Sequence, residues 1–145
     1  MVTIELSYQG SLRCEAVHGP SGSKLITDAP VDNHGKGAAF SPTDLVATAL
    51  GTCLATMMGI VAERDGISLE GLRVRVQKEM VADPHRRIGR LEVEVRMPAG
   101  LSPGQRGKLE AAARLCPVRQ SLSPAVQTPL AFLYPDSPGV EAPRP

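Results

Sequence analysis

The 145-residue sequence predicts an α+β fold organised around one long apolar helix. Between Ser41 and Arg64 the side chains are apolar almost all round, and a helix of this kind must be covered on most sides by the protein itself or by a partner. Strand-like segments come before it and after it. The order is three strands, the long helix, two strands, two helices and a strand, which is typical of an α+β arrangement and not of an alternating parallel one.

The amino-terminal part predicts three short strands. Residues 2–8 alternate apolar and polar side chains, residues 9–11 suit a tight turn, and residues 12–18 alternate again, which indicates a hairpin. Residues 24–27 form a third short strand. Residues 28–37 hold proline, asparagine and glycines with little to bury, so we expect a loop that leads to Ser41.

The start of the long helix has three matching signals. Ser41 is a good N-cap, Pro42 suits the first helical position, and Asp44 can reach back to the cap while it meets the positive end of the helix dipole. Cys53 lies near the middle of this helix and is therefore an interior thiol.

The carboxyl-terminal part predicts three more strands and two more helices. Residues 69–80 and 88–97 alternate as two strands, Ser102 caps a helix that runs to Cys116, and Pro117 forces a break before a short helix over residues 118–122. Residues 128–134 form a last strand. We expect one domain over residues 1–134 and a flexible tail over residues 135–145, which holds four prolines.

Composition excludes several classes of function. The net charge is +1, aromatic residues make up 3% of the chain and tryptophan is absent, so a nucleic-acid interface is not expected. The amino terminus lacks the pattern of a secretory signal, and the apolar helix is interrupted by threonine and glycine, so we expect no membrane span. The histidines share no ligand spacing, and we expect no metal.

Three cysteines bear on the chemistry: Cys14, Cys53 and Cys116. They lie far apart, without the C-x-x-C spacing of a zinc or thioredoxin motif, and their odd number favours the reducing cytoplasm. A disulfide here is expected to be transient and chemical. Cys14, on a strand, reads as a packing residue.

The segment Cys116-Pro-Val-Arg-Gln-Ser-Leu122, together with Ser41-Pro-Thr-Asp-Leu45 and Cys53 in a buried helix, resembles the OsmC/Ohr family of osmotically inducible and organic-hydroperoxide-resistance proteins. The resemblance runs over nearly the whole chain. It implies an intertwined homodimer with two central helices packed among antiparallel sheets, and reduction of organic hydroperoxides. It further implies that Cys53 is the peroxidatic and Cys116 the resolving cysteine, with a dithiol as reductant and no cofactor.

The chemistry of the residues is compatible with that role. A thiolate attacks the peroxide oxygen and becomes a sulfenic acid, and a second thiol prevents overoxidation by closing a disulfide. Burial alone disfavours a thiolate, so a cation or a helix N-terminus must stabilise it. Cys116 precedes a predicted helix start, whereas Cys53 in mid-helix has no such help nearby.

One position departs from the family pattern. Peroxidase members carry a glutamate ten residues before the first cysteine, where it holds an arginine over the thiolate, and this chain has Thr43 there. Asp44 lies roughly 180° round the helix from Cys53, whereas a ten-residue spacing is about 80° off, so we assign Asp44 to the cap. Lys36 lacks the forked geometry of arginine, which leaves Arg13 as the candidate for activating the thiolate.

Two functions follow as hypotheses. The first is a cytoplasmic, dimeric, cofactor-free thiol peroxidase that acts on small hydrophobic organic hydroperoxides through Cys53 and Cys116. The alternative is a protein of the same fold with little peroxidase activity, which binds a small lipophilic ligand or acts as a redox sensor. The missing glutamate separates them.

Overall fold

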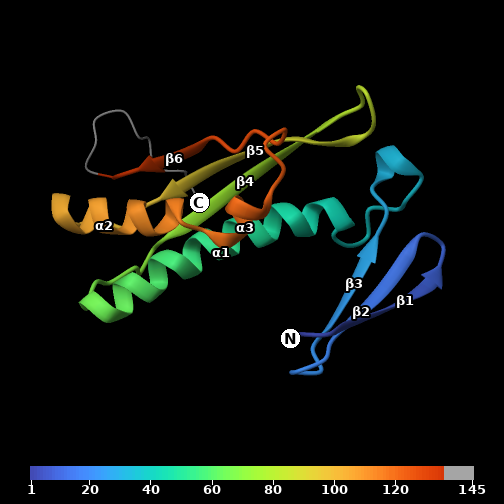
Figure 1. The fold of residues 1–145 in the computed structure, drawn as a ribbon, viewed down its shortest axis with the longest axis horizontal. Helices are drawn as coiled ribbons and strands as arrows, with labels where there is room; N and C mark the ends of the chain where they lie inside the picture. Colours follow the sequence, from blue (N-terminus) through green and yellow to red (C-terminus); the bar gives the residue numbers. More distant parts are fainter. Residues whose placement is uncertain (136–145) are drawn as a thin grey trace. The chain divides into compact units, whose positions relative to one another are not determined.

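The computed structural model describes residues 1–135 and confirms the α+β class. The chain divides into two compact units, Met1–Val46 and Ala47–Pro145, which are taken in turn (Figure 1). The expected tail over residues 135–145 lies, apart from its first residue, outside the described residues, and the single-domain expectation stays a prediction.

The first unit is built on a three-stranded antiparallel sheet. Its strands are β1 (Ile4–Gly10), β2 (Arg13–His18) and β3 (Lys24–Asp28), in that order across the sheet. These confirm the three strands read from the alternating pattern. The apolar side chains of β1 are uncovered, with Leu6 72% and Tyr8 67% exposed. This face therefore has no packing partner among residues 1–135.

The loop after β3 contains a short 3-10 helix, η1 (Val31–Asn33), and ends where the long helix begins. Asp28 is buried and ties the two ends of this loop together. Its amide donates to the Phe40 carbonyl at 3.1 Å, and its Oδ2 accepts from the Ala38 amide at 2.9 Å. The segment that leads into the helix is held beside the end of β3.

The long helix is α1 (Pro42–Asp65), and its cap is the one expected. The Asp44 amide donates to Ser41 Oγ at 3.1 Å, and the Ser41 amide donates to Asp44 Oδ2 at 2.8 Å. This reciprocal capping box satisfies two amides at the helix start. The carboxylate of Asp44 is therefore engaged in the cap.

The second unit contains a sheet in the order β4 (Arg73–Val81), β5 (Arg87–Arg96) and β6 (Leu130–Leu133). The predicted alternation is confirmed on β5, where Leu91, Val93 and Val95 are buried and Glu92 is exposed. One detail differs from the antiparallel sheets expected. β6 pairs with β5 in parallel, because the chain returns through two helices before it joins the sheet edge.

α1 packs its buried stripe against this sheet within the second unit (Figure 1). A Cβ placed on Gly51 would lie 2.9 Å from Val76 Cγ2 and 3.5 Å from Val74 Cγ1, both on β4. By length and hydropathy α1 could also cross a membrane, but its buried side chains include Leu50, Leu54 and Met58, which form part of the core. We therefore read it as a core helix.

α2 (Pro103–Arg114) and α3 (Pro117–Ser121) complete the second unit. Ser102 caps α2 through a capping box with Gln105, as the sequence predicts for that serine. The Tyr134 hydroxyl donates to Glu110 Oε1 at 2.6 Å, which joins α2 to the residue after β6.

Candidate functional site

The structure brings Cys53 and Cys116 together within the second unit, 63 positions apart in sequence (116 − 53). Cys53 is half-buried on α1, beside the stripe formed by Leu50 and Leu54. Cys116 is fully buried, and Cys53 lies near enough to raise the pKa of its thiol. Both are free thiols. Their catalytic roles stay a prediction.

Local sequence determines the backbone at Cys116. Pro117 cannot continue α2, but it suits the first position of a new helix, so α3 begins directly after the cysteine. The Cys116 amide donates to the Ala113 carbonyl at 3.1 Å, and the Cys116 carbonyl accepts from the Gln120 amide at 3.1 Å. The cysteine is therefore held from both neighbouring helices.

The electrostatics of Cys116 favour the protonated thiol. Burial raises the pKa of Cys116, and the hydrogen bond and the charge of Cys53 raise it further. The backbone N–H groups of Arg119 and Val118, at the start of α3, oppose that rise in pKa because they favour the thiolate. Cys116 thus keeps its proton, and its buried thiol lies beside Cys53.

The groups considered for activating Cys53 lie in the first unit. Thr43 Oγ1 lies 3.1 Å from Ser41 Oγ, within the cap of α1. Arg13 is on β2, opposite Asp28 of β3, and its Nε is buried without a hydrogen-bond partner among the described residues. Since the two cysteines belong to the other unit, the activating role of Arg13 stays a prediction.

Cys14 and the histidines form no site in the described part of the chain. Cys14 is half-buried on β2, paired in register with Tyr8 and Thr27. Among residues 1–135, no three His, Cys, Asp or Glu side chains are grouped so that they could hold a metal ion.

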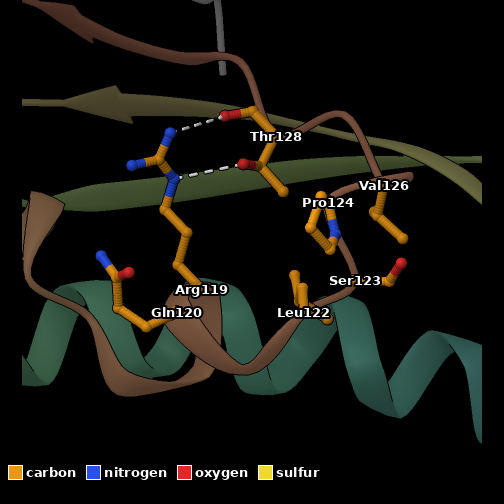
Figure 2. Close-up of a pocket in the computed structure, with 7 residues that line it drawn as sticks. All are labelled: Arg119, Gln120, Leu122, Ser123, Pro124, Val126 and Thr128. Carbon is orange, nitrogen blue, oxygen red and sulfur yellow. Dashed lines mark hydrogen bonds between the residues drawn. The ribbon is translucent and has the colours of Figure 1, made fainter.

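A pocket of about 260 Å³ lies beside α3 (Figure 2). Arg119 contributes its one charged side chain, with Nε donating to Thr128 Oγ1 at 3.2 Å and Nη2 to the Thr128 carbonyl at 3.4 Å. The other lining residues are Gln120, Leu122, Ser123, Pro124 and Val126. This lining is largely polar, unlike the apolar cavity that a lipophilic ligand would need.

Sequence reasoning missed Arg119. The residue lies inside the segment that carries the family resemblance, yet its partner Thr128 is nine positions away, across a turn. Periodicity predicts neither end of such a contact. The one available signal was an arginine three residues after a cysteine at a helix start.

Comparisons with known proteins agree on one family. The model of the OsmC-like protein family matches residues 34–130. No curated protein matches the chain. An osmotic stress induced and detoxification response protein from Psychrobacter arcticus has a solved structure that is 40% identical, with a TM-score of 0.85, and the match covers 92% of this chain and 96% of that one.

Two more distant structures share the fold. An organic hydroperoxide resistance protein OsmC from Legionella pneumophila is 21% identical, with a TM-score of 0.73 over 91% of this chain and 96% of its own. One from Vibrio cholerae, with captopril bound in one of its active sites, is 14% identical, with a TM-score of 0.69 and 90% of each chain covered. Since the family model spans most of the sequence and the 40% identical relative nearly all of it, the chain belongs to the OsmC-like protein family.

Proposed function

We propose that this protein is a cysteine-dependent peroxidase that reduces organic hydroperoxides, with Cys53 as the peroxidatic and Cys116 as the resolving cysteine. The observation that carries the proposal is the proximity of the two thiols, with Cys116 buried and protonated beside Cys53. Two relatives of the same fold are described as organic hydroperoxide resistance proteins, which is consistent with it.

The reaction needs no group beyond the two thiols and a reductant. The Cys53 thiolate attacks one oxygen of the hydroperoxide, the O–O bond breaks, and an alcohol leaves once its alkoxide is protonated. The Cys116 thiol then attacks the sulfenic acid, forms the disulfide and releases water. A dithiol donates two electrons and returns both cysteines to the reduced state.

We expect this peroxidase to be slow. Thr43 replaces the glutamate that would hold an arginine over the thiolate, and Asp44 is engaged with Ser41 in the helix cap. Each unit of thiol pKa left unshifted corresponds to about 1.4 kcal/mol of thiolate stabilisation that is lacking.

The assembly that we propose is a homodimer in the cytoplasm. Proteins of the OsmC-like family are small soluble proteins, and free thiols suit a reducing compartment. α1 leaves Thr48, Thr52, Thr56 and Ile60 exposed. The Thr52 hydroxyl donates to the Thr48 carbonyl at 2.8 Å, so its polarity is satisfied within the helix and this face can meet an apolar partner.

The direct test follows cumene hydroperoxide loss with a dithiol reductant in excess. The unmutated protein should consume peroxide over many turnovers. The Cys116→Ser variant should consume peroxide for only a few turnovers, until Cys53 is overoxidised, and the Cys53→Ser variant should consume none. Consumption that survives in Cys53→Ser would disprove the assignment. If a Cys53–Cys116 disulfide forms but peroxide is not turned over, the protein is a redox sensor instead.

A further inference from the structure

Arg119 links the helix that begins after Cys116 to a distant part of the second unit. It lies in α3, which Cys116 caps, and the Cys116 carbonyl accepts from the neighbouring Gln120 amide at 3.1 Å. Its side chain makes two hydrogen bonds with Thr128, through Nε to the hydroxyl and through Nη2 to the carbonyl (Figure 2). The short helix that follows Cys116 is therefore tied through Arg119 to Thr128.

Thr128 is itself anchored to the sheet. On one side of it, the Gln127 amide donates to the Gly89 carbonyl at 2.9 Å, and the Gln127 carbonyl accepts from the Leu91 amide at 2.8 Å. On the other side, the Pro129 carbonyl accepts from the Val93 amide at 2.9 Å. Thr128 thus lies in a segment bonded to β5 both before and after it, and a side chain that holds Thr128 is held to the sheet.

Arg119 acts on Cys116 as part of α3 and not through its charge. Its backbone N–H lowers the pKa of Cys116, and its guanidinium makes no ion pair with a described residue. The guanidinium uses both of its hydrogen bonds on the neutral Thr128. An arginine placed to attract a thiolate would direct its fork at the sulfur, whereas the N–H groups of this fork donate to Thr128.

We propose that the contact between Arg119 and Thr128, here called the Arg119 clasp, positions the Cys116 sulfur for attack on oxidised Cys53. Arg119 is a positioning residue in this proposal. The proposal rests on the proposed function, in which Cys53 forms a sulfenic acid. It states that the clasp controls which product this sulfenic acid gives.

Two reactions compete for that sulfenic acid. In the first, the Cys116 sulfur attacks the Cys53 sulfur, an S–S bond forms as the S–O bond breaks, and the hydroxyl leaves with the Cys116 proton as water. In the second, another hydroperoxide transfers an oxygen to Cys53, which becomes a sulfinic acid while an alcohol is released. Only the first depends on the position of Cys116, so a loosened clasp favours the second.

The experiment measures how oxidised Cys53 divides between these products. Full-length protein is reduced and treated with increasing cumene hydroperoxide, and peptide mass spectrometry gives the ratio of Cys53–Cys116 disulfide to Cys53 sulfinic acid. We expect Arg119→Gln and Thr128→Val to lower that ratio about fivefold, the effect of losing hydrogen bonds of ordinary strength. Thr128→Ser keeps the hydroxyl and should behave as the unmutated protein.

Two controls separate positioning from charge and from stability. Arg119→Lys keeps the charge but loses the fork, so it should resemble Arg119→Gln. Arg114→Gln removes an arginine of α2 whose side chain contacts Glu110 and the Phe132 ring instead of Thr128, and should leave the ratio unchanged. A full rescue by lysine, or a lower thermal midpoint with an unchanged ratio in the clasp variants, would overturn the proposal.

A second measurement needs no peroxide and keeps the two proposals distinguishable. Equilibration in a thiol–disulfide redox buffer gives the fraction of Cys53–Cys116 disulfide, which should fall in Arg119→Gln because Cys116 is less well placed. If hydroperoxide never oxidises Cys53 but this shift occurs, the clasp stands and the peroxidase function fails. The opposite result is also informative. If peroxide is turned over, and Arg119→Gln changes neither the ratio of disulfide to sulfinic acid nor the disulfide fraction in the redox buffer, the clasp is disproved and the function stands.

Discussion

Cys53 and Cys116 are chemically alike but sit in different surroundings. Cys116 is completely buried and holds its proton, while Cys53 is half-exposed at the edge of the buried stripe of α1. A hydroperoxide can therefore approach Cys53 more readily than Cys116. This difference in exposure supports the roles proposed for the two cysteines, with Cys53 attacking and Cys116 resolving.

The raised pKa of Cys116 predicts a pH dependence of stability. The folded pKa lies above the unfolded value of about 8.5, so the folded state holds the proton more tightly. Its contribution is complete below the unfolded pKa and is lost as pH rises through the folded pKa. Urea unfolding of the reduced protein at pH 7 and pH 10 should show a larger loss of stability for the unmutated chain than for Cys116→Ser. Equal losses would contradict this prediction.

Thr43 and Arg13 make a second prediction at this scale. We expect Thr43→Glu to raise the rate constant for Cys53 oxidation, because a carboxylate there can hold an arginine over the thiolate. The gain should require Arg13, whose buried Nε has no hydrogen-bond partner in the described residues. Stopped-flow oxidation of Thr43→Glu and of Thr43→Glu with Arg13→Met should therefore differ. A gain that persists in the double variant would assign the role to another cation.

At the scale of elements, the site depends on how closely α1 approaches β4. Gly51 lies two residues before Cys53 and faces Val76 and Val74, and it has no side chain to hold the helix away. Helical glycine is ordinarily costly relative to alanine, by about 1 kcal/mol. Its presence here is explained by the short distance between helix and strand.

Replacement of two helical glycines tests that explanation. In Gly51→Ala the new Cβ would lie 2.9 Å from Val76 Cγ2, so overpacking of about 1–3 kcal/mol should outweigh the gain in helix propensity. Gly59→Ala meets nothing within 4 Å and should stabilise the protein by up to about 1 kcal/mol. Urea denaturation measures both. Equal stabilisation of the two variants would show that α1 has room to move away from β4.

At the scale of the whole molecule, two apolar surfaces are left without cover in the described chain. One is the face of β1 that carries Ile4, Leu6 and Tyr8, and the other is the exposed face of α1 that carries Ile60. A second copy of the chain is the partner proposed for them, since stable homodimers bury large apolar areas.

Sedimentation at micromolar concentration tests the dimer. We expect the unmutated protein to sediment as a dimer and Leu6→Lys to shift toward monomer, because the lysine would bury a charge in an apolar interface. Glu5→Lys changes the neighbouring residue on the opposite face of β1 and should remain dimeric. A folded monomer of the unmutated protein would refute the proposed assembly.

Most of the elements could be predicted from the sequence, because each depends on local pattern. The alternation in β4 and β5, the Ser41 and Ser102 caps and the break at Pro117 were all readable and are confirmed. The parallel pairing of β6 with β5 was not, since strand direction depends on where α2 and α3 return the chain. The contact between Arg119 and Thr128 was also missed, because it too depends on where the chain returns to the sheet.

The sequence by itself determined the α+β class, the long helix that carries Cys53, and the resemblance of the Cys116 segment to one family. Those properties arise from residues within a few positions of one another. Only the tertiary structure decided that the Cys116 thiol meets Cys53, that burial keeps Cys116 protonated, and that Arg119 reaches Thr128. Each of these depends on distance through space and on exclusion of water, which residues far apart in the chain acquire only when the helices pack on the sheet.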